Sequence, residues 1–242
     1  MKTLALLSAL LLVSSATAVA GPGGLNLGWN DCGGFPATLN RQFACNTNTG
    51  INTLVGSFVT PCCVTAMIAN EIVMNLQSSA ATWPAWWSMG SGLCRPSSLF
   101  SNFDFTPGPF NCLDYWQGGA VGGQLLDQIV GNHARLRVIC ALPAGDPRIT
   151  SIPEGFEVYS YKVIINNAKS VGSACPGCLT PVCIVLNSIT IDQPDGTPGG
   201  NILVSASAVR NYATWQGDFP GGCTIPTPTR NTTWGSIKAL YR

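Results

Sequence analysis

Eleven cysteines constrain this chain more than any other feature, because all of them follow a segment with the features of a secretory signal peptide. That segment covers residues 1–20: Lys2 gives a basic start, residues 4–13 are apolar except for Ser8, and residues 18–20 fit a small-x-small cleavage site. The apolar run is too short to cross a membrane core of about 30 Å. We therefore predict export into an oxidising compartment, with an uncleaved N-terminal anchor as the alternative.

In that compartment the cysteines are expected to form structural disulfides, and their odd number leaves at least one unpaired or paired between chains. Spacing does not determine the pairing. A Cys32–Cys45 bond would close a short loop, and the adjacent Cys62 and Cys63 should have different partners, since their side chains point to opposite faces of an extended chain. The candidates are Cys32, Cys45, Cys62, Cys63, Cys94, Cys112, Cys140, Cys175, Cys178, Cys183 and Cys223.

Three of these cysteines form a dense cluster at Cys175, Cys178 and Cys183. A C-x-x-C pair serves redox chemistry when it begins a helix, but here a strand-like segment follows. A zinc site would need a second ligand pair, which the sequence lacks. The cluster therefore favours structural disulfides over a redox or zinc site, and we predict no cofactor.

Strand-like segments separated by turns rich in Gly, Pro and Asn dominate the middle of the chain. In residues 135–140 apolar side chains alternate with two arginines, and residues 182–191 are apolar on both faces, as in a central strand. Residues 156–166 should place Tyr159 and Tyr161 on one face. A helix competes with a strand over residues 64–77. Seven to nine strands of this kind predict an all-β, antiparallel β-sandwich with irregular, disulfide-rich loops.

The domain organisation follows from these segments. We expect an irregular N-terminal lead-in over residues 21–50, the β-sandwich domain over 51–220 and a Pro/Thr linker over 221–232. The last ten residues, 233–242, are either a sorting tag or an element docked on the domain. No other stretch reaches about 18 apolar residues, so no membrane span is predicted.

Charge and residue counts narrow the functional classes. Lys and Arg number 12 against 11 Asp and Glu, with no basic run, which argues against nucleic acid as a partner. His133 is the only histidine, so zinc enzymes with several His ligands are excluded. A secreted hydrolase would need a pair of carboxylates. The candidates are Asp104, Asp114, Glu154 and Glu157, and no spacing singles out a pair.

Tryptophans are the other candidate site residues. Trp83, Trp86 and Trp116 could form a platform that stacks on sugar rings, although large aromatic side chains also fill the cores of β-sandwiches. The platform would bind a polysaccharide, whereas the alternative assigns the same rings to packing.

Two stretches carry a resemblance to known proteins. Residues 68–87, with Glu71 and a Trp-Pro-x-Trp-Trp motif, look like part of a group of uncharacterised secreted bacterial proteins, and so do residues 162–187. Their strand order resembles the immunoglobulin/cohesin-like and carbohydrate-binding-module type of β-sandwich. The resemblance implies a non-catalytic module that binds a cell-surface protein or polysaccharide.

We therefore predict a secreted, disulfide-stabilised and non-catalytic β-sandwich that acts in binding or assembly at the cell surface. Two alternatives remain: a glycan-binding module that uses the exposed tryptophans, and a hydrolase with a carboxylate pair.

Overall fold

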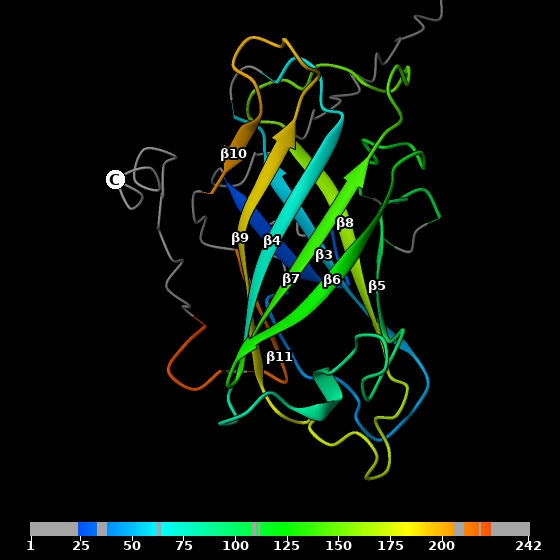
Figure 1. The fold of residues 1–242 in the computed structure, drawn as a ribbon, viewed down its shortest axis with the longest axis vertical. Coiled ribbons are helices and arrows are strands. Elements are labelled where there is room, and N and C mark those ends of the chain that lie inside the picture. The colour runs from blue at the N-terminus through cyan, green and yellow to red at the C-terminus, as the bar shows by residue number, and fades with distance from the viewer. Residues whose placement is uncertain are drawn as a thin grey trace, which may run out of the picture.

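The protein is described by a computed structural model that covers residues 24–32, 38–61, 64–107, 110, 112–205, 211–217 and 219–223. The predicted signal peptide, most of the predicted linker, the C-terminal tail, Cys62 and Cys63 lie outside the described residues. Two β-sheets face each other in two layers, and their strands run along the long axis of the molecule (Figure 1). Among the described residues no helix is long and apolar enough to span a membrane.

The smaller sheet has four antiparallel strands. Their order is β1 (Leu25–Trp29), β3 (Ile51–Val59), β8 (Glu157–Asn166) and β5 (Leu99–Asn102). The larger sheet has seven strands. Its path is β2 (Asn40–Arg41), β11 (Tyr212–Trp215), β9 (Val182–Asp192), β4 (Ala69–Ser78), β7 (His133–Ala141) and β6 (Val121–Val130), and β10 (Ile202–Val204) also pairs with β9. One 3-10 turn, η1 (Ala85–Trp87), joins β4 to β5. The prediction of an antiparallel β-sandwich is confirmed.

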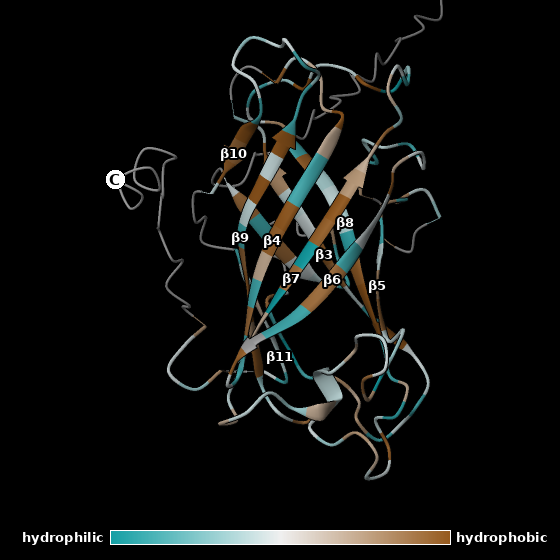
Figure 2. Ribbon diagram, viewed as in Figure 1, coloured by the Kyte–Doolittle hydropathy of each residue, from teal (hydrophilic) through white to brown (hydrophobic). Residues whose placement is uncertain are grey.

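Side-chain alternation explains the two layers. In β7 the residues Leu136, Val138 and Cys140 are buried between the sheets, and Arg137 points outward, as predicted. In β4 the residues Ile72 and Met74 are buried, so this segment is a strand and not the competing helix. Figure 2 shows the alternation as brown and teal bands along these strands. Strand β9 lies inside the sheet with neighbours on both sides, as its doubly apolar sequence predicts.

Two local predictions are wrong. The lead-in is not wholly irregular, because residues 25–29 form β1, which is buried along its whole length and pairs with β3. Tyr159 and Tyr161 do not share a face, because the register shifts opposite Gly56 and Ser57 and leaves Ser160 as an extra residue. The Ser160 hydroxyl donates to Asn70 Oδ1 at 2.8 Å in the interior, whereas Tyr161 enters the core.

Four disulfides join distant parts of the chain. They are Cys32–Cys112, Cys45–Cys178, Cys94–Cys175 and Cys183–Cys223. The short Cys32–Cys45 loop is therefore not formed. The three clustered cysteines each have a different distant partner, as the interpretation of the cluster as structural disulfides predicts.

Cys140 is the free cysteine among the described residues, and it is buried between the sheets. Burial raises the pKa of its thiol to about 12, so the reactive thiolate is scarce at neutral pH. We expect iodoacetamide at pH 8 to leave Cys140 unmodified in the native protein and to alkylate it fully in denaturant. Peptide mass spectrometry would measure both states, and rapid native alkylation would contradict the buried position.

Candidate binding surface

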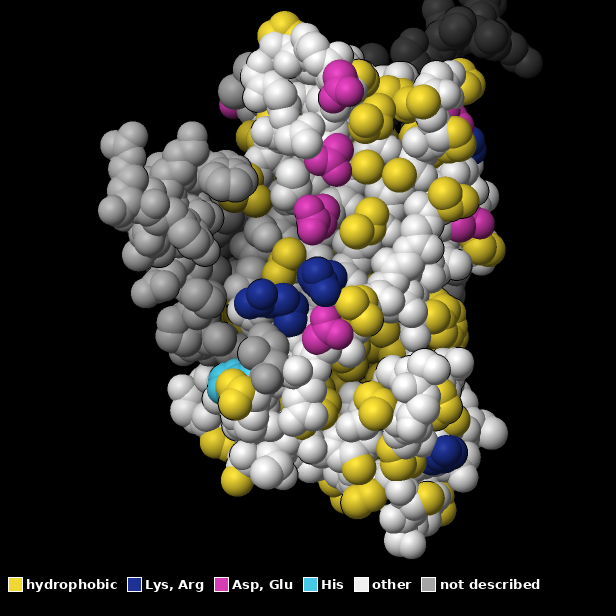
Figure 3. Space-filling view, in the orientation of Figure 1, with side chains coloured by type: hydrophobic (Ala, Val, Ile, Leu, Met, Phe, Trp, Pro, Cys, Tyr) yellow, Lys and Arg dark blue, Asp and Glu magenta, His cyan; other side chains and the backbone are white. Residues whose placement is uncertain are grey.

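The outer face of the larger sheet carries three rows of side chains that cross β4, β7 and β6. The pairing register places them in line as Glu71–Ile139–Gly123, Val73–Arg137–Leu125 and Asn75–Arg135–Asp127. Directly opposed residues of antiparallel strands share a face, so each row runs across this face of the sheet, and Asn75 alone of the nine residues is buried. Figure 3 views this face and shows apolar and charged side chains intermixed on it.

A shallow hollow of about 280 Å³ lies where the first two rows meet. Its floor is apolar, because Leu125 and Ile139 are 50% and 53% exposed and Gly123 has no side chain. A Cβ atom built on Gly123 would meet nothing within 4 Å, so the glycine leaves open space. We call this feature the β6–β7 hollow; its lining is Glu71, Gly123, Gln124, Leu125, Arg137 and Ile139.

Opposite charges flank the floor of the β6–β7 hollow. On one side Arg137 Nη2 lies 3.1 Å from Asp127 Oδ2, and about half of each side chain is exposed. On the other side Glu71 is exposed, and its carboxylate has no hydrogen bond or ion pair with any residue that the structure describes. Acidic side chains gather toward one end of this face and basic ones toward its middle (Figure 3).

Asp192 adds to the negative end. It lies on β9 opposite Ala69, two residues along from Thr190, which is opposite Glu71, and Asn201 Nδ2 donates to its Oδ1 at 2.7 Å. Partial burial, together with the negative charge of Glu71, raises the pKa of Asp192 above its usual range. Two acids in this position would be stabilised by a cation from a binding partner.

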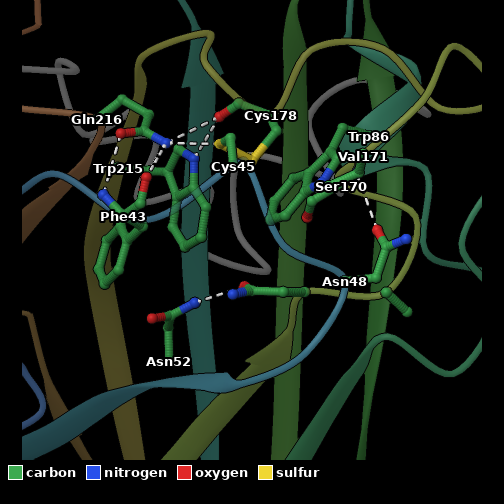
Figure 4. The surroundings of a disulfide bond; sticks show 12 residues. Phe43, Cys45, Asn48, Asn52, Trp86, Ser170, Val171, Cys178, Trp215 and Gln216 are labelled. Atoms are coloured by element: carbon green, nitrogen blue, oxygen red, sulfur yellow. Dashed lines mark hydrogen bonds between the residues drawn. A yellow bond between two sulfur atoms is a disulfide. The ribbon is translucent and has the colours of Figure 1, made fainter.

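The predicted tryptophan platform is not present in the described structure. Trp83, Trp86 and Trp116 are all buried, so their rings offer no stacking surface. The three indole N–H groups donate to Trp87 O, Ser170 Oγ and Ser160 O. Figure 4 shows Trp86 beside Ser170, close to the Cys45–Cys178 disulfide. The packing alternative accounts for these positions, because each N–H finds an internal acceptor.

The predicted carboxylates come together only in part. Thr106 donates through its backbone N–H to Asp104 Oδ1 and through its hydroxyl to Asp114 Oδ2, at 2.9 and 3.2 Å. Glu157 instead accepts from Ser57 Oγ at 2.7 Å, and Glu154 is exposed in a turn. The Thr106 bonds lower the pKa of Asp104, which is opposite to the shift that a general acid at neutral pH requires. The described residues hold no group of three or more potential metal ligands.

The sequence predicted the outward orientation of some residues that lie in or beside the β6–β7 hollow, but not of the others. It placed Glu71, Arg135 and Arg137 on outward faces, where the structure also has them. It did not identify β6, whose Gly122 and Gly123 disfavour a strand, and so it missed Leu125. One residue could have indicated an apolar surface here. Ile139 is apolar but lies on the outward face of β7, in line with Arg135 and Arg137.

Comparisons with known proteins give little beyond the fold. No protein-family model matches the sequence, and no curated protein matches it. A solved structure that the chain is similar to is the cohesin module from the Clostridium perfringens ATCC13124 family 33 glycoside hydrolase. The identity is 8% and the TM-score 0.34, over 80% of this chain and 94% of that one. This is a weak resemblance at the level of the fold.

Proposed function

We propose that the protein is a secreted, non-catalytic module that binds a protein at the cell surface through the β6–β7 hollow. The observation that carries the proposal is the exposed apolar floor of Leu125, Ile139 and Gly123 between Glu71 and Arg137. Binding surfaces combine such an apolar centre with a polar rim, which supplies orientation and specificity.

Rigidity supports a binding role. The lining residues lie on paired strands, so their positions are fixed before any partner arrives. A preorganised site loses little conformational entropy on binding. Four disulfides further restrain the loops and support export to an oxidising compartment.

The chemistry of the hollow favours a protein over a polysaccharide. Its lining has no aromatic ring to stack on a sugar, whereas its charges suit a peptide chain. We expect the partner to insert an aliphatic side chain over Gly123 and to place a Lys or Arg beside Glu71. An acidic group would then lie near Arg137, in competition with Asp127.

The test is binding of labelled mature protein to the surface of the cells that produce it. We expect saturable binding that Ile139→Asp weakens at least about tenfold, because a charge on the floor would lose its hydration on contact. Glu71→Lys should weaken binding by repelling the cation of the partner. Treating the cells with protease should abolish binding, and treating them with glycosidases should leave it unchanged.

The matched control is Leu179→Asp, which changes a 73% exposed leucine in the loop before β9 and outside the hollow. It should bind like the wild type. Equal thermal unfolding of all variants would show that they are folded. Wild-type binding by Ile139→Asp, or binding that survives protease and is lost to glycosidases, would contradict the proposal.

A further inference from the structure

Strand β6 is the outermost strand of the larger sheet. It is ten residues long, and among the described strands it pairs with β7 alone, so no described strand pairs with its other edge. The other outer strands are shorter: β2 has two residues, β10 three, β5 four, and β1 has five that are all buried. Short or covered edges limit unwanted pairing between proteins. Among the strands that the structure describes, β6 alone is a long edge.

The first half of β6 is tied to the smaller sheet at one point. Gln124 Oε1 accepts from Ser101 N at 2.8 Å, and Gln124 Nε2 donates to Leu99 O at 3.1 Å. The Gln124 side chain thus occupies the edge of β5 and does not use the backbone of β6. Within the described part of the chain, no hydrogen bond outside the β7 ladder reaches the main chain of residues 125–130.

Residues 125–130 carry one of the usual protections of an edge strand, a register shift between Gln128 and Val130, and few of the others. The segment has no proline or lysine, and its one charged side chain, Asp127, is paired with Arg137 on β7. Gln128 is exposed, and Val130 is 69% exposed. An apolar edge with open backbone groups can accept another strand by β-augmentation.

We propose that β6 pairs with β6 of a second copy of this chain, antiparallel and around a two-fold axis. A second copy brings a strand that is already extended, so pairing avoids the cost of ordering a peptide, about 1–2 kcal/mol per residue. The chain has a formal net charge of only +1, so two copies repel each other weakly. Pairing would join two larger sheets into one continuous sheet, with the two β6–β7 hollows on the same side.

Asp127 restricts the register of the pair. Two aspartates directly opposite each other would destabilise it, so the axis should not pass through Asp127. The axis should lie to one side of that residue, which sets each Asp127 opposite an uncharged residue of the other β6. This inference uses the strand edge and does not require that the hollow bind a protein.

The experiment is sedimentation equilibrium of the mature protein between about 1 and 100 µM. We expect a monomer–dimer equilibrium in which the apparent mass rises from near that of the monomer toward that of the dimer across this range. The double variant Gln128→Lys/Val130→Lys should stay monomeric, because the two-fold axis brings four positive charges together. Both positions are exposed and lie outside the hollow, so thermal unfolding should match the wild type.

A charge-reversed partner makes the test specific. Gln128→Glu/Val130→Glu should also be monomeric alone, and an equimolar mixture of the two variants should recover a dimer of mixed composition. A wild type that is monomeric at 100 µM would overturn the inference, as would a lysine variant that dimerises or a mixture that stays monomeric. Cell binding by the monomeric lysine variant would test the hollow separately, because its lining is unchanged.

Discussion

Removing the Cys45–Cys178 disulfide by a Cys45→Ala/Cys178→Ala double substitution is expected to lower the free energy of unfolding by about 4 kcal/mol or more. The bond joins residues 133 positions apart, but the Cys32–Cys112 and Cys94–Cys175 bonds shorten the loop that it closes to about 35 residues, for which the chain-entropy model gives about 4 kcal/mol. Domains have total stabilities of about 5–15 kcal/mol. The variant should therefore lose a large share of the stability of the domain.

Contacts around this disulfide add to the expected loss. Trp215 Nε1 donates to Cys178 O at 2.8 Å, and Gln216 Nε2 donates to the same oxygen at 3.1 Å (Figure 4). The ring of Trp215 stacks on Phe43 with centroids 4.1 Å apart. The disulfide therefore holds the buried aromatic residues at this end of the sandwich in place. It also lowers the conformational entropy of the unfolded chain.

Urea unfolding followed by tryptophan fluorescence would measure the change. The matched control is Cys183→Ala/Cys223→Ala, whose bond spans 40 positions and should cost about 4 kcal/mol. The order of the two losses is the informative result. The two bonds close loops of similar length, so a larger loss from the control pair would show that the aromatic contacts add nothing to the effect of the Cys45–Cys178 bond.

The two sheets could be predicted largely because their strands alternate strongly. In β7 each outward arginine is followed by an inward apolar residue, and in β9 both faces are apolar, so the local sequence determines the strand. Strand β6 lacks such a signal. Its Gly-Gly, Leu-Leu and Asp-Gln steps fit no period of two, and it is extended because β7 pairs with it on both sides of a register shift between Gln128 and Val130.

Burial of the tryptophans and the disulfide pairing could not be predicted for a related reason. A tryptophan in a loop can face solvent or core, and the choice depends on whether an acceptor such as Ser160 O lies within reach of its N–H. Ser160 is itself positioned by a register shift between β3 and β8, which is invisible in either strand alone. The disulfides span 40 to 133 positions, so spacing carries no information about them.

Arg95 is expected to be the most sensitive single position in the described chain. Its side chain is buried at 1% exposure, and the guanidinium lies 3.5 Å from the centroid of the Trp86 ring. It donates to Ala168 O at 2.7 Å, to Trp86 O at 2.8 Å and to Asn166 O. No described carboxylate forms a salt bridge with it. Burial lowers its pKa to about 10, so the group stays charged at neutral pH.

Three backbone carbonyl groups therefore stabilise the buried charge of Arg95. All three accept their hydrogen bonds from the N–H groups of one planar guanidinium. We expect Arg95→Met to lower the free energy of unfolding by about 3 kcal/mol or more, because each buried acceptor left unpaired costs about 1 kcal/mol or more. Arg95→Lys should cost a similar amount. A single ammonium group keeps the charge buried but cannot reproduce the geometry of the guanidinium toward three separate oxygens.

Urea unfolding of both variants, beside Arg137→Met, would check this expectation. Arg137 is half exposed and its ion pair with Asp127 is solvated, so its substitution should change the free energy of unfolding by less than about 1 kcal/mol. A wild-type midpoint for Arg95→Lys would mean that charge alone is sufficient and that the three hydrogen bonds contribute little. The expected result is a large loss of stability in both Arg95 variants. It would show that the three hydrogen bonds of the guanidinium, and not the charge alone, stabilise the protein around Arg95.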